Sequence, residues 1–473
     1  MIRRLLSIQI IKNFSVLTGT NIAIQFLSIM SSIRLARLLQ PAGYGLFNLM
    51  MIQAGLFSII AVFGLGVVII RNVARNKSDS KYLFNVSNQI RLVTTLLAVA
   101  SLLIYNIFIN KTSIGPLFLF LLSIYIIFQS LWDSIQCIAF GNERMEATGY
   151  INLLFTGLWV IGVYVIPKLS FNIENLLTIY VILQIIKTIS YYYWLNKKIF
   201  RKDHPATSNP DINFKSIILQ SNYYFVLAIF TAFQNQVPVL LLDHNSTLEQ
   251  VGIFNLGYRI LLPLQMVMGV ALTALFPSFS RLASANKELF ATRVRNLLNL
   301  ELLIGVWGCL CFTLFSKEVV IILYGKAYIE SVQVILIQCW YTLLYSIFCT
   351  VGTVLSAFDK QRALVIITIV CSFIALPFYL IGTRYGAIGL AYAFVVSGFV
   401  NLTIPWRELK KSLNPYLDYS YSLKFILILF ATAGLSILFP IEFSFWIKLA
   451  LGLLITICVG YYIRIKVLKQ IIA

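Results

Sequence analysis

Residues 38–70 read LLQPAGYGLFNLMMIQAGLFSIIAVFGLGVVII, a stretch without a single Asp, Glu, Lys or Arg. A helix needs about 20 apolar residues to cross the hydrocarbon core of a membrane, so this stretch is long enough. Similar charge-free runs recur at 13–33, 92–110, 112–132, 147–167, 216–242, 260–280, 331–358, 363–383 and 385–406. Only 11% of the chain is charged and 59% is hydrophobic, whereas soluble domains are about 25% charged. The sequence therefore predicts an integral membrane protein.

The hydrophobic pattern predicts an all-α chain with about fourteen transmembrane helices. We expect them near 13–37, 44–70, 87–109, 114–139, 148–166, 174–195, 217–242, 253–276, 297–316, 331–357, 363–383, 387–405, 423–440 and 443–463. No connecting loop is long enough for a soluble catalytic domain.

The strongly basic charge of the chain, formally +20, raises the question of nucleic-acid binding. Of the 37 lysines and arginines, 26 lie in segments on one side of the predicted helices and six on the other. Positive residues collect on the cytoplasmic side of membrane proteins. The charge therefore predicts membrane orientation, with both termini in the cytoplasm, and no nucleic-acid partner.

An internal repeat divides the chain. Residues 45–49 read GLFNL and residues 252–256 read GIFNL, and each opens the second helix of its half. A second match pairs residues 139–140 with 357–358, and each closes a fourth helix. The repeat predicts a six-helix lobe at 1–200, a second at 201–410, and two additional helices at 411–473. Two parallel repeats of this kind favour a transporter that rocks about a shared cleft.

Polar side chains mark the predicted walls of that cleft. In the first helix Asn21, Gln25 and Ser28 share one face with Thr18 and Ser32. The alternatives are a cavity lining and helix–helix packing through small polar residues. In the seventh helix, Gln234 and Asn235 precede Pro238, which can kink the helix.

Three arginines in the spans are candidates for binding an anion. Arg259 lies within the eighth helix on the same face as Asn255, because the two are one turn apart. Its alternative is a structural pair with Asp243 at the end of the seventh helix. Arg34 and Arg37 lie at the end of the first helix, where they could instead snorkel to the interface.

Asp133 in the fourth helix and Lys187 in the sixth are candidates for ion coupling or substrate binding, as ionisable residues within a membrane often are. Both are close enough to a helix end to snorkel instead. Asp243 is a third candidate, for coupling or an ion pair. Arg91 and Glu301 lie closer to the cytoplasmic interface and are expected to be anchors. The seven cysteines have no metal-ligand spacing, so no metal or other cofactor is expected.

Soluble catalytic motifs such as a P-loop, GxSxG or HExxH are missing from the sequence. The chain instead resembles the polysaccharide-biosynthesis (O-antigen flippase) family of the multidrug/oligosaccharidyl-lipid/polysaccharide (MOP) exporter superfamily. The resemblance covers nearly the whole chain through loose motifs. They are residues 34–47 (RLARLLQPAGYGLF), 63–66 (FGLG), 71–75 (RNVAR), 251–254 (VGIF) and 385–391 (YGAIGLA).

The resemblance implies two six-helix lobes in a V, with two extra helices, in a bacterial inner membrane. It implies a flippase, not an enzyme, that moves undecaprenyl-diphosphate-linked oligosaccharide outward by alternating access. Arg259 would bind the diphosphate, with Arg34 and Arg37 behind it. Membrane lipids, a polysaccharide polymerase and a chain-length regulator would be partners. The alternatives are an ion-coupled drug/cation antiporter of the same superfamily and a membrane saccharide polymerase.

Overall fold

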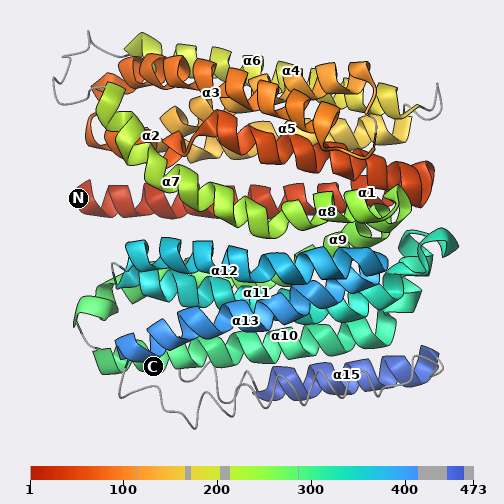
Figure 1. The fold of residues 1–473 in the computed structure, drawn as a ribbon. Coiled ribbons are helices and arrows are strands. Elements are labelled where there is room, and N and C mark those ends of the chain that lie inside the picture. Colours follow the sequence, from red (N-terminus) through yellow and green to blue (C-terminus); the bar gives the residue numbers. More distant parts are fainter. Residues whose placement is uncertain are drawn as a thin grey trace. The chain divides into compact units, whose positions relative to one another are not determined.

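The computed structural model describes residues 2–112, 114–165, 172–202, 214–285, 287–358, 360–413 and 445–462. The side chains of 1–15, 17, 202, 267, 270–287, 361, 445, 455 and 458–462 lie outside this description. Within these ranges the chain is helical and contains no strand, which confirms the all-α class (Figure 1). The chain forms two compact units, Met1–His244 and Asn245–Ala473. These units are defined by packing, whereas the lobes at 1–200 and 201–410 follow from the repeat and stay a prediction.

The first unit contains eight described helices. They are α1 (Ile2–Val62), α2 (Leu65–Arg75), α3 (Ser80–Phe108), α4 (Pro116–Gly141), α5 (Met145–Val165), α6 (Ile173–Lys198), α7 (Phe214–Asn235) and α8 (Val237–Asn245), with short 3-10 turns η1 (Lys77–Asp79) and η3 (Phe200–Lys202). Two of the predicted helices are joined in α1, which bends at Gln40 (φ 57°, ψ 172°) before Pro41. Proline lacks an N–H and disfavours helical geometry in the residue before it.

The second predicted helix, 44–70, is wrong in its extent, because the structure breaks it at Phe63 and Gly64. Both residues have left-handed backbone conformations, with φ of 51° and 63°. The break exposes the last carbonyls of α1, and Thr94 of α3 donates a hydrogen bond to the carbonyl of Ala61 at 2.8 Å. The predicted seventh helix is likewise divided into α7 and α8, at a junction that Pro238 follows closely.

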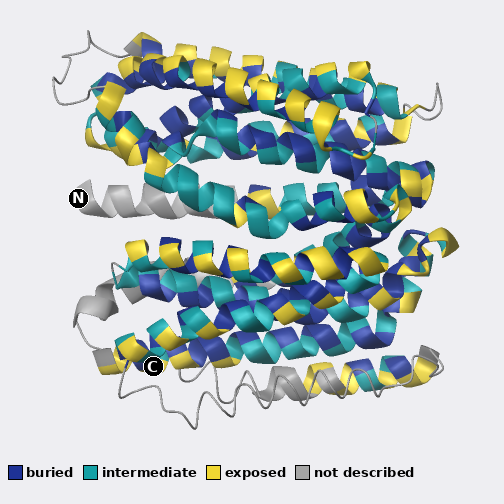
Figure 2. Ribbon diagram, in the orientation of Figure 1, coloured by how far each residue is buried: buried dark blue, intermediate teal, exposed yellow. Residues whose placement is uncertain are grey.

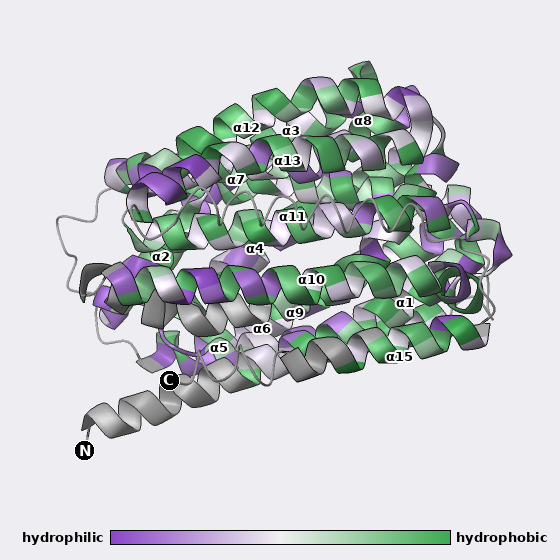
Figure 3. Ribbon diagram, turned by 90° about the horizontal axis from the view of Figure 1, so that it is seen from below, coloured by the Kyte–Doolittle hydropathy of each residue, from purple (hydrophilic) through white to green (hydrophobic). Residues whose placement is uncertain are grey.

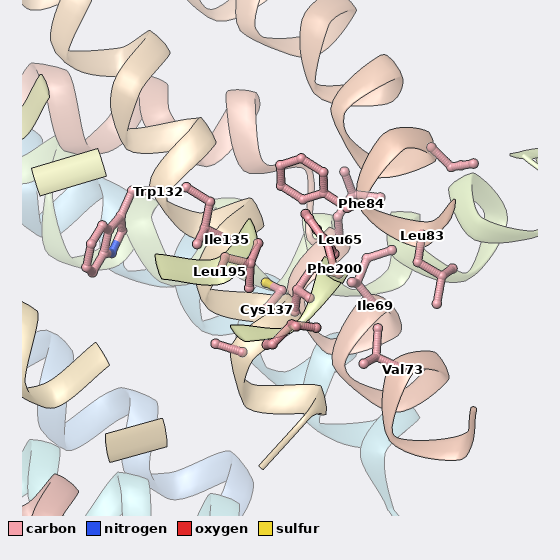
Figure 4. Close-up of a cluster of buried hydrophobic side chains, with 14 of the residues drawn as sticks. Leu65, Ile69, Val73, Leu83, Phe84, Trp132, Ile135, Cys137, Leu195 and Phe200 are labelled. Atoms are coloured by element: carbon pink, nitrogen blue, oxygen red, sulfur yellow. The ribbon is translucent and has the colours of Figure 1, made fainter. Parts of the chain in front are cut away.

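Two clusters of buried apolar side chains lie within the described part of the first unit. One unites α2, α3, α4 and α6 through side chains such as Leu65, Ile69, Leu83, Ile135 and Leu195, which Figure 4 draws. The other lies along α1, α3, α4 and α6, around Met50, Ala54, Leu122, Ile126 and Val181. Each helix therefore buries one stripe on its neighbours, as apolar packing within a bundle requires.

The second unit has six described helices. They are α9 (Leu248–Ala285), α10 (Lys287–Leu323), α11 (Ser331–Ala357), α12 (Gln361–Gly382), α13 (Gly386–Leu413) and α15 (Phe445–Tyr462), with 3-10 turns η4 (Lys326–Tyr328) and η5 (Thr383–Tyr385). α15 is fixed to α10 by polar contacts. Lys448 Nζ lies 2.7 Å from Glu318 Oε1, and Trp307 donates to Thr456 at 3.0 Å.

Apolar side chains remain exposed along the faces that do not pack. In α3 these include Leu92, Leu96, Ile104, Ile107 and Phe108, and Figure 2 shows the exposed positions along the helices. Figure 3 shows hydrophobic residues along most of α12. A soluble protein would bury such surfaces, whereas lipid tails solvate them.

Nine helical stretches within the described ranges are long and apolar enough to cross a membrane. Two of them, Thr18–Val62 and Arg362–Leu413, are roughly twice the length that a single crossing needs. The second contains two predicted helices, and the first covers most of two others. The thirteenth predicted helix, 423–440, lies outside the described residues. The multi-span architecture is thus confirmed, and the count of fourteen stays a prediction.

Candidate functional site

A cavity of about 540 Å³ lies in the first unit, where the broken end of α1 and the start of α2 meet α7. Its lining is Ile59, Val62, Gly64, Gly66, Val67, Tyr224, Leu227, Ala228, Thr231, Ala232, Asn235 and Gln236. Gly64 permits a close approach of α7, since a Cβ there would lie 2.5 Å from the backbone nitrogen of Phe225. The Phe63 and Phe225 rings pack at 4.5 Å between centroids.

The polar part of this cavity comes from α7 and the residue that follows it. Thr231 and Asn235 lie one turn apart, and Asn235 Nδ2 donates to the carbonyl of Thr231 at 2.8 Å. Gln236 separates α7 from α8, and its Oε1 is buried without a hydrogen-bond partner among the described residues. Gln234, also predicted as a lining residue, is half-buried and is not among the residues that line this cavity.

The polar stripe of α1 has a graded exposure. Asn21 is exposed, whereas Gln25 and Ser28 are half-buried. Ser32 is buried and shares a 2.7 Å hydrogen bond with the hydroxyl of Tyr44. Ser32 therefore packs within α1, whereas the side chains of Asn21, Gln25 and Ser28 remain at least partly exposed.

An ion pair between a buried arginine and a half-buried aspartate lies beside the cavity. Arg91 of α3 is 2% exposed, and its Nη2 lies 2.6 Å from Asp133 Oδ2 of α4. The guanidinium also donates to Ser87 Oγ at 3.1 Å and to the carbonyl of Ser130 at 2.9 Å. A Cβ on Gly66, which lines the cavity, would lie 4.0 Å from Asp133 Oδ2.

The interpretation of Arg91 as an interfacial anchor is therefore wrong, because α4 covers the side chain and supplies a carboxylate. Lys187, another predicted candidate, lies half-buried on α6. Its Nζ sits 4.3 Å from the centre of the Trp132 ring, which is a cation–π geometry.

The three candidate arginines differ in environment. Arg34 is half-buried in α1 with its guanidinium carbon 5.5 Å from the centre of the Tyr164 ring. Its Nε is buried without a hydrogen-bond partner in the described part of the chain. Arg37 is exposed. In the second unit Arg259 is half-buried on α9, one turn from the half-buried Asn255, whose amide donates to the carbonyl of Val251.

Ion pairs distinguish these arginines from Arg91. Across the described ranges, neither Arg34 nor Arg259 lies within ion-pair distance of a carboxylate.

Two of the acidic residues singled out in the sequence are enclosed by protein. Asp243 of α8 and Glu301 of α10 are each 2% exposed. Asp243 Oδ1 accepts a hydrogen bond from Thr112 at 2.7 Å, and Glu301 Oε1 accepts one from Thr350 at 2.6 Å. The interpretation of Glu301 as an interfacial anchor is wrong, because α11 covers it. The spacing of residues along a single helix does not predict the buried environment of either carboxylate.

The arginine and acidic side chains differ in how far the protein encloses them. Half-buried guanidiniums can attract a bulky anion, whereas the enclosed carboxylates admit at most a small ion. The carboxylate beside the cavity, Asp133, is already neutralised by Arg91.

Solved structures of two transporters share this fold. A lipid II flippase in an inward closed conformation superimposes with a TM-score of 0.68, at 16% identity, over 95% of this chain and 98% of that one. An inward-facing multidrug resistance MATE family transporter of the MOP superfamily gives 0.64, at 14% identity, over 83% and 96%.

The profile of the family described as "Polysaccharide biosynthesis protein" matches residues 10–283, and the chain belongs to this family. It is 22% identical to "Probable low-salt glycan biosynthesis flippase Agl15" of Haloferax volcanii, over 92% of this chain and 90% of that protein. It is also 22% identical to "Capsular polysaccharide biosynthesis protein CapF" of Staphylococcus aureus, over 83% and 97%.

Proposed function

We propose that this protein is a flippase for undecaprenyl-diphosphate-linked oligosaccharide, an O-antigen or capsule repeat unit. It carries this lipid from the cytoplasmic to the outer face of a bacterial inner membrane, and both of its termini are cytoplasmic. The polysaccharide-biosynthesis family and a relative named as a glycan flippase support the substrate class. The protein is not an enzyme in this proposal, since translocation breaks no covalent bond.

One observation carries the proposal. The half-buried guanidiniums of Arg34 and Arg259 face no carboxylate among the described residues, while the carboxylates of Asp243 and Glu301 are enclosed. A diphosphate cannot cross hydrocarbon unaided, because burying its charge without partners has a very large cost. Charge-assisted hydrogen bonds from arginine lower that cost and suit phosphate geometry.

Alternating access supplies the movement. In this proposal the two repeats, 1–200 and 201–410, rock about a polar cleft, and the lipid tail stays in the bilayer while the saccharide crosses. The cleft would be lined by Asn21, Gln25, Ser28, Gln234, Asn235 and Asn255. A polysaccharide polymerase and a chain-length regulator would receive the product.

A flipping assay tests the proposal. Proteoliposomes would contain undecaprenyl-diphosphate-linked oligosaccharide and the purified protein, and an added glycan-degrading enzyme would report substrate in the outer leaflet. We expect the accessible fraction to rise with the wild type. An accessible fraction equal to that of protein-free liposomes would refute the flippase function.

The drug/cation antiporter of the same superfamily is the competing function, since a MATE transporter shares the fold. The same liposomes loaded with a fluorescent organic cation would test it. Efflux of the cation without flipping of the lipid would favour the antiporter. Flipping without cation efflux is the expected result.

A further inference from the structure

The cavity between α2 and α7 is bordered at one end by an arginine that is not part of its lining. Arg71 lies one turn of α2 beyond the lining residue Val67, and therefore on the same face. Gln220 lies one turn of α7 before Tyr224, which also lines the cavity. The guanidinium of Arg71 donates a hydrogen bond to Gln220 Oε1, where α2 and α7 lie side by side (Figure 1). The cavity thus ends at a polar contact between the two helices.

The side chains of this polar contact can reach a ligand from outside the protein. Arg71 and Gln220 are both exposed. Because the carbonyl oxygen of the Gln220 amide accepts from Arg71, its nitrogen remains a donor for a ligand. Arg75 follows Arg71 by one turn and is exposed as well. Neither arginine forms an ion pair within the ranges that the structure describes. This end of the cavity therefore combines hydrogen-bond donors with positive charge.

The cavity itself suits a hydrocarbon chain. Its lining is mostly apolar, and its volume of about 540 Å³ lies in the range of small-ligand sites. Val67 at its edge is 49% exposed, so the cavity is open to the side. Thr231 and Asn235 donate to backbone carbonyls of α7 at 2.8 Å each, so these donors are already used. The last polar lining residue, Gln236, follows the end of α7 that is opposite to Tyr224. A chain that enters beside Tyr224 therefore meets apolar walls first.

We propose that Arg71, Gln220 and the cavity bind one anionic phospholipid, with its phosphate at the two side chains and an acyl chain in the cavity. Arginine forms strong, charge-assisted hydrogen bonds to phosphate oxygens. Basic pockets between transmembrane helices on the cytoplasmic side bind anionic head groups. The positive charge of Arg75 favours a lipid with a net negative head group over a zwitterionic one. In the proposed orientation this end of α2 and α7 is cytoplasmic, so the lipid comes from that leaflet.

The position of the site favours a resting phospholipid over the saccharide lipid in passage. Arg71 directly follows the predicted span 44–70, which is the depth of lipid phosphates. Between the two helices, a Cβ on Gly64 would lie 2.5 Å from the backbone nitrogen of Phe225. The helices therefore touch there and leave no passage for an oligosaccharide between them. A bound phospholipid would stabilise this contact of α2 with α7, whether or not the protein passes the flipping assay.

Native mass spectrometry of the full-length protein in mild detergent, without any saccharide, measures lipid binding. The probes are dioleoyl phosphatidylglycerol, dioleoyl phosphatidylcholine, glycerol phosphate and undecaprenyl phosphate. We expect one saturable site for phosphatidylglycerol, at least tenfold tighter than for phosphatidylcholine or glycerol phosphate. Equal affinities for the two phospholipids would overturn recognition by charge, and equal affinity for glycerol phosphate would overturn the acyl chain in the cavity. Undecaprenyl phosphate binding tenfold tighter than phosphatidylglycerol would assign the site to the saccharide carrier and overturn the proposal.

Variants locate the phosphate and the chain separately. Arg71→Gln, at an exposed position, should weaken phosphatidylglycerol binding at least tenfold. Ala228→Phe places a ring in the cavity and should weaken it to a similar extent while leaving Arg71 in place. Lys198→Gln, an exposed cation at the end of α6, and Ala100→Phe, at an exposed position of α3, are the matched controls and should keep the wild-type affinity. Wild-type affinity in Arg71→Gln, or a loss as large in Lys198→Gln, would refute the site.

Discussion

Replacement of Gly64 by alanine should destabilise the first unit at the junction of α1, α2 and α7. Gly64 has a φ of 63°, and a left-handed backbone costs a residue with a Cβ about 1–2 kcal/mol. The added methyl would lie 2.5 Å from the nitrogen of Phe225 and 2.7 Å from the carbonyl oxygen of Ser221. These are backbone atoms of α7, which can yield only if the helix moves.

Overpacking of this kind typically costs about 1–3 kcal/mol. Together with the backbone term, Gly64→Ala should lower the free energy of unfolding by about 2–5 kcal/mol. Gly157→Ala is the matched control, because a Cβ at Gly157 in α5 meets nothing within 4 Å. In a helix that change should be neutral or stabilise by up to about 1 kcal/mol.

The assay is unfolding of the purified protein in mixed micelles by increasing SDS, followed by circular dichroism. Gly64→Ala should unfold at clearly lower SDS than both the wild type and Gly157→Ala. If Gly64→Ala and Gly157→Ala unfold together, α7 does not press on Gly64 as the structure describes. The reasoning from the close approach would then be refuted.

Two further predictions concern charges. Asp133→Leu should lower the free energy of unfolding by about 3–5 kcal/mol, because it leaves the buried Arg91 guanidinium without its carboxylate. The double variant Arg91→Met/Asp133→Leu should recover most of that loss. Additive effects of the two substitutions in SDS unfolding would contradict the pairing. Arg259→Ala should reduce flipping about 10- to 100-fold, the equivalent of a charge-assisted hydrogen bond of about 1.5–3 kcal/mol. Arg144→Ala, at an exposed position, is its control, and equal flipping by the two variants would remove Arg259 from the substrate site.

Helix positions can largely be predicted from the sequence, because charge-free runs report directly on hydrocarbon spans. The bends at Gln40 and Gln236 accompany Pro41 and Pro238, so each has a sequence signal. The break at Phe63 has a weaker sequence signal. Phenylalanine rarely adopts a left-handed backbone, and the packing of its ring on Phe225 favours this conformation.

The environments of ionisable residues cannot be predicted in the same way. The sequence places Arg91 and Glu301 by their distance from a helix end, which describes depth in the membrane. Their burial depends instead on which neighbouring helix covers them, α4 for Arg91 and α11 for Glu301. Pattern along one helix carries no information about that partner.

The motif at residues 63–66, FGLG, can now be understood residue by residue. Gly64 admits the backbone of α7, and Leu65 is completely buried in the core of the first unit. Gly66 differs from Gly64, because a Cβ there would make ordinary contacts, at 3.4 Å from Cys137 Sγ and 4.0 Å from Asp133 Oδ2. The two glycines should therefore respond differently to the same substitution.

Gly66→Ala should be tolerated in folding and gain up to about 1 kcal/mol from helix propensity, since Gly66 lies in the first turn of α2. Its methyl would nevertheless occupy the space between the cavity and Asp133. If access from the cavity to the Arg91–Asp133 pair matters for transport, flipping should fall while SDS unfolding stays at or above the wild-type midpoint. Unfolding of Gly66→Ala at as low an SDS concentration as Gly64→Ala would mean that both glycines serve close packing, and the distinction drawn from their contacts would be wrong.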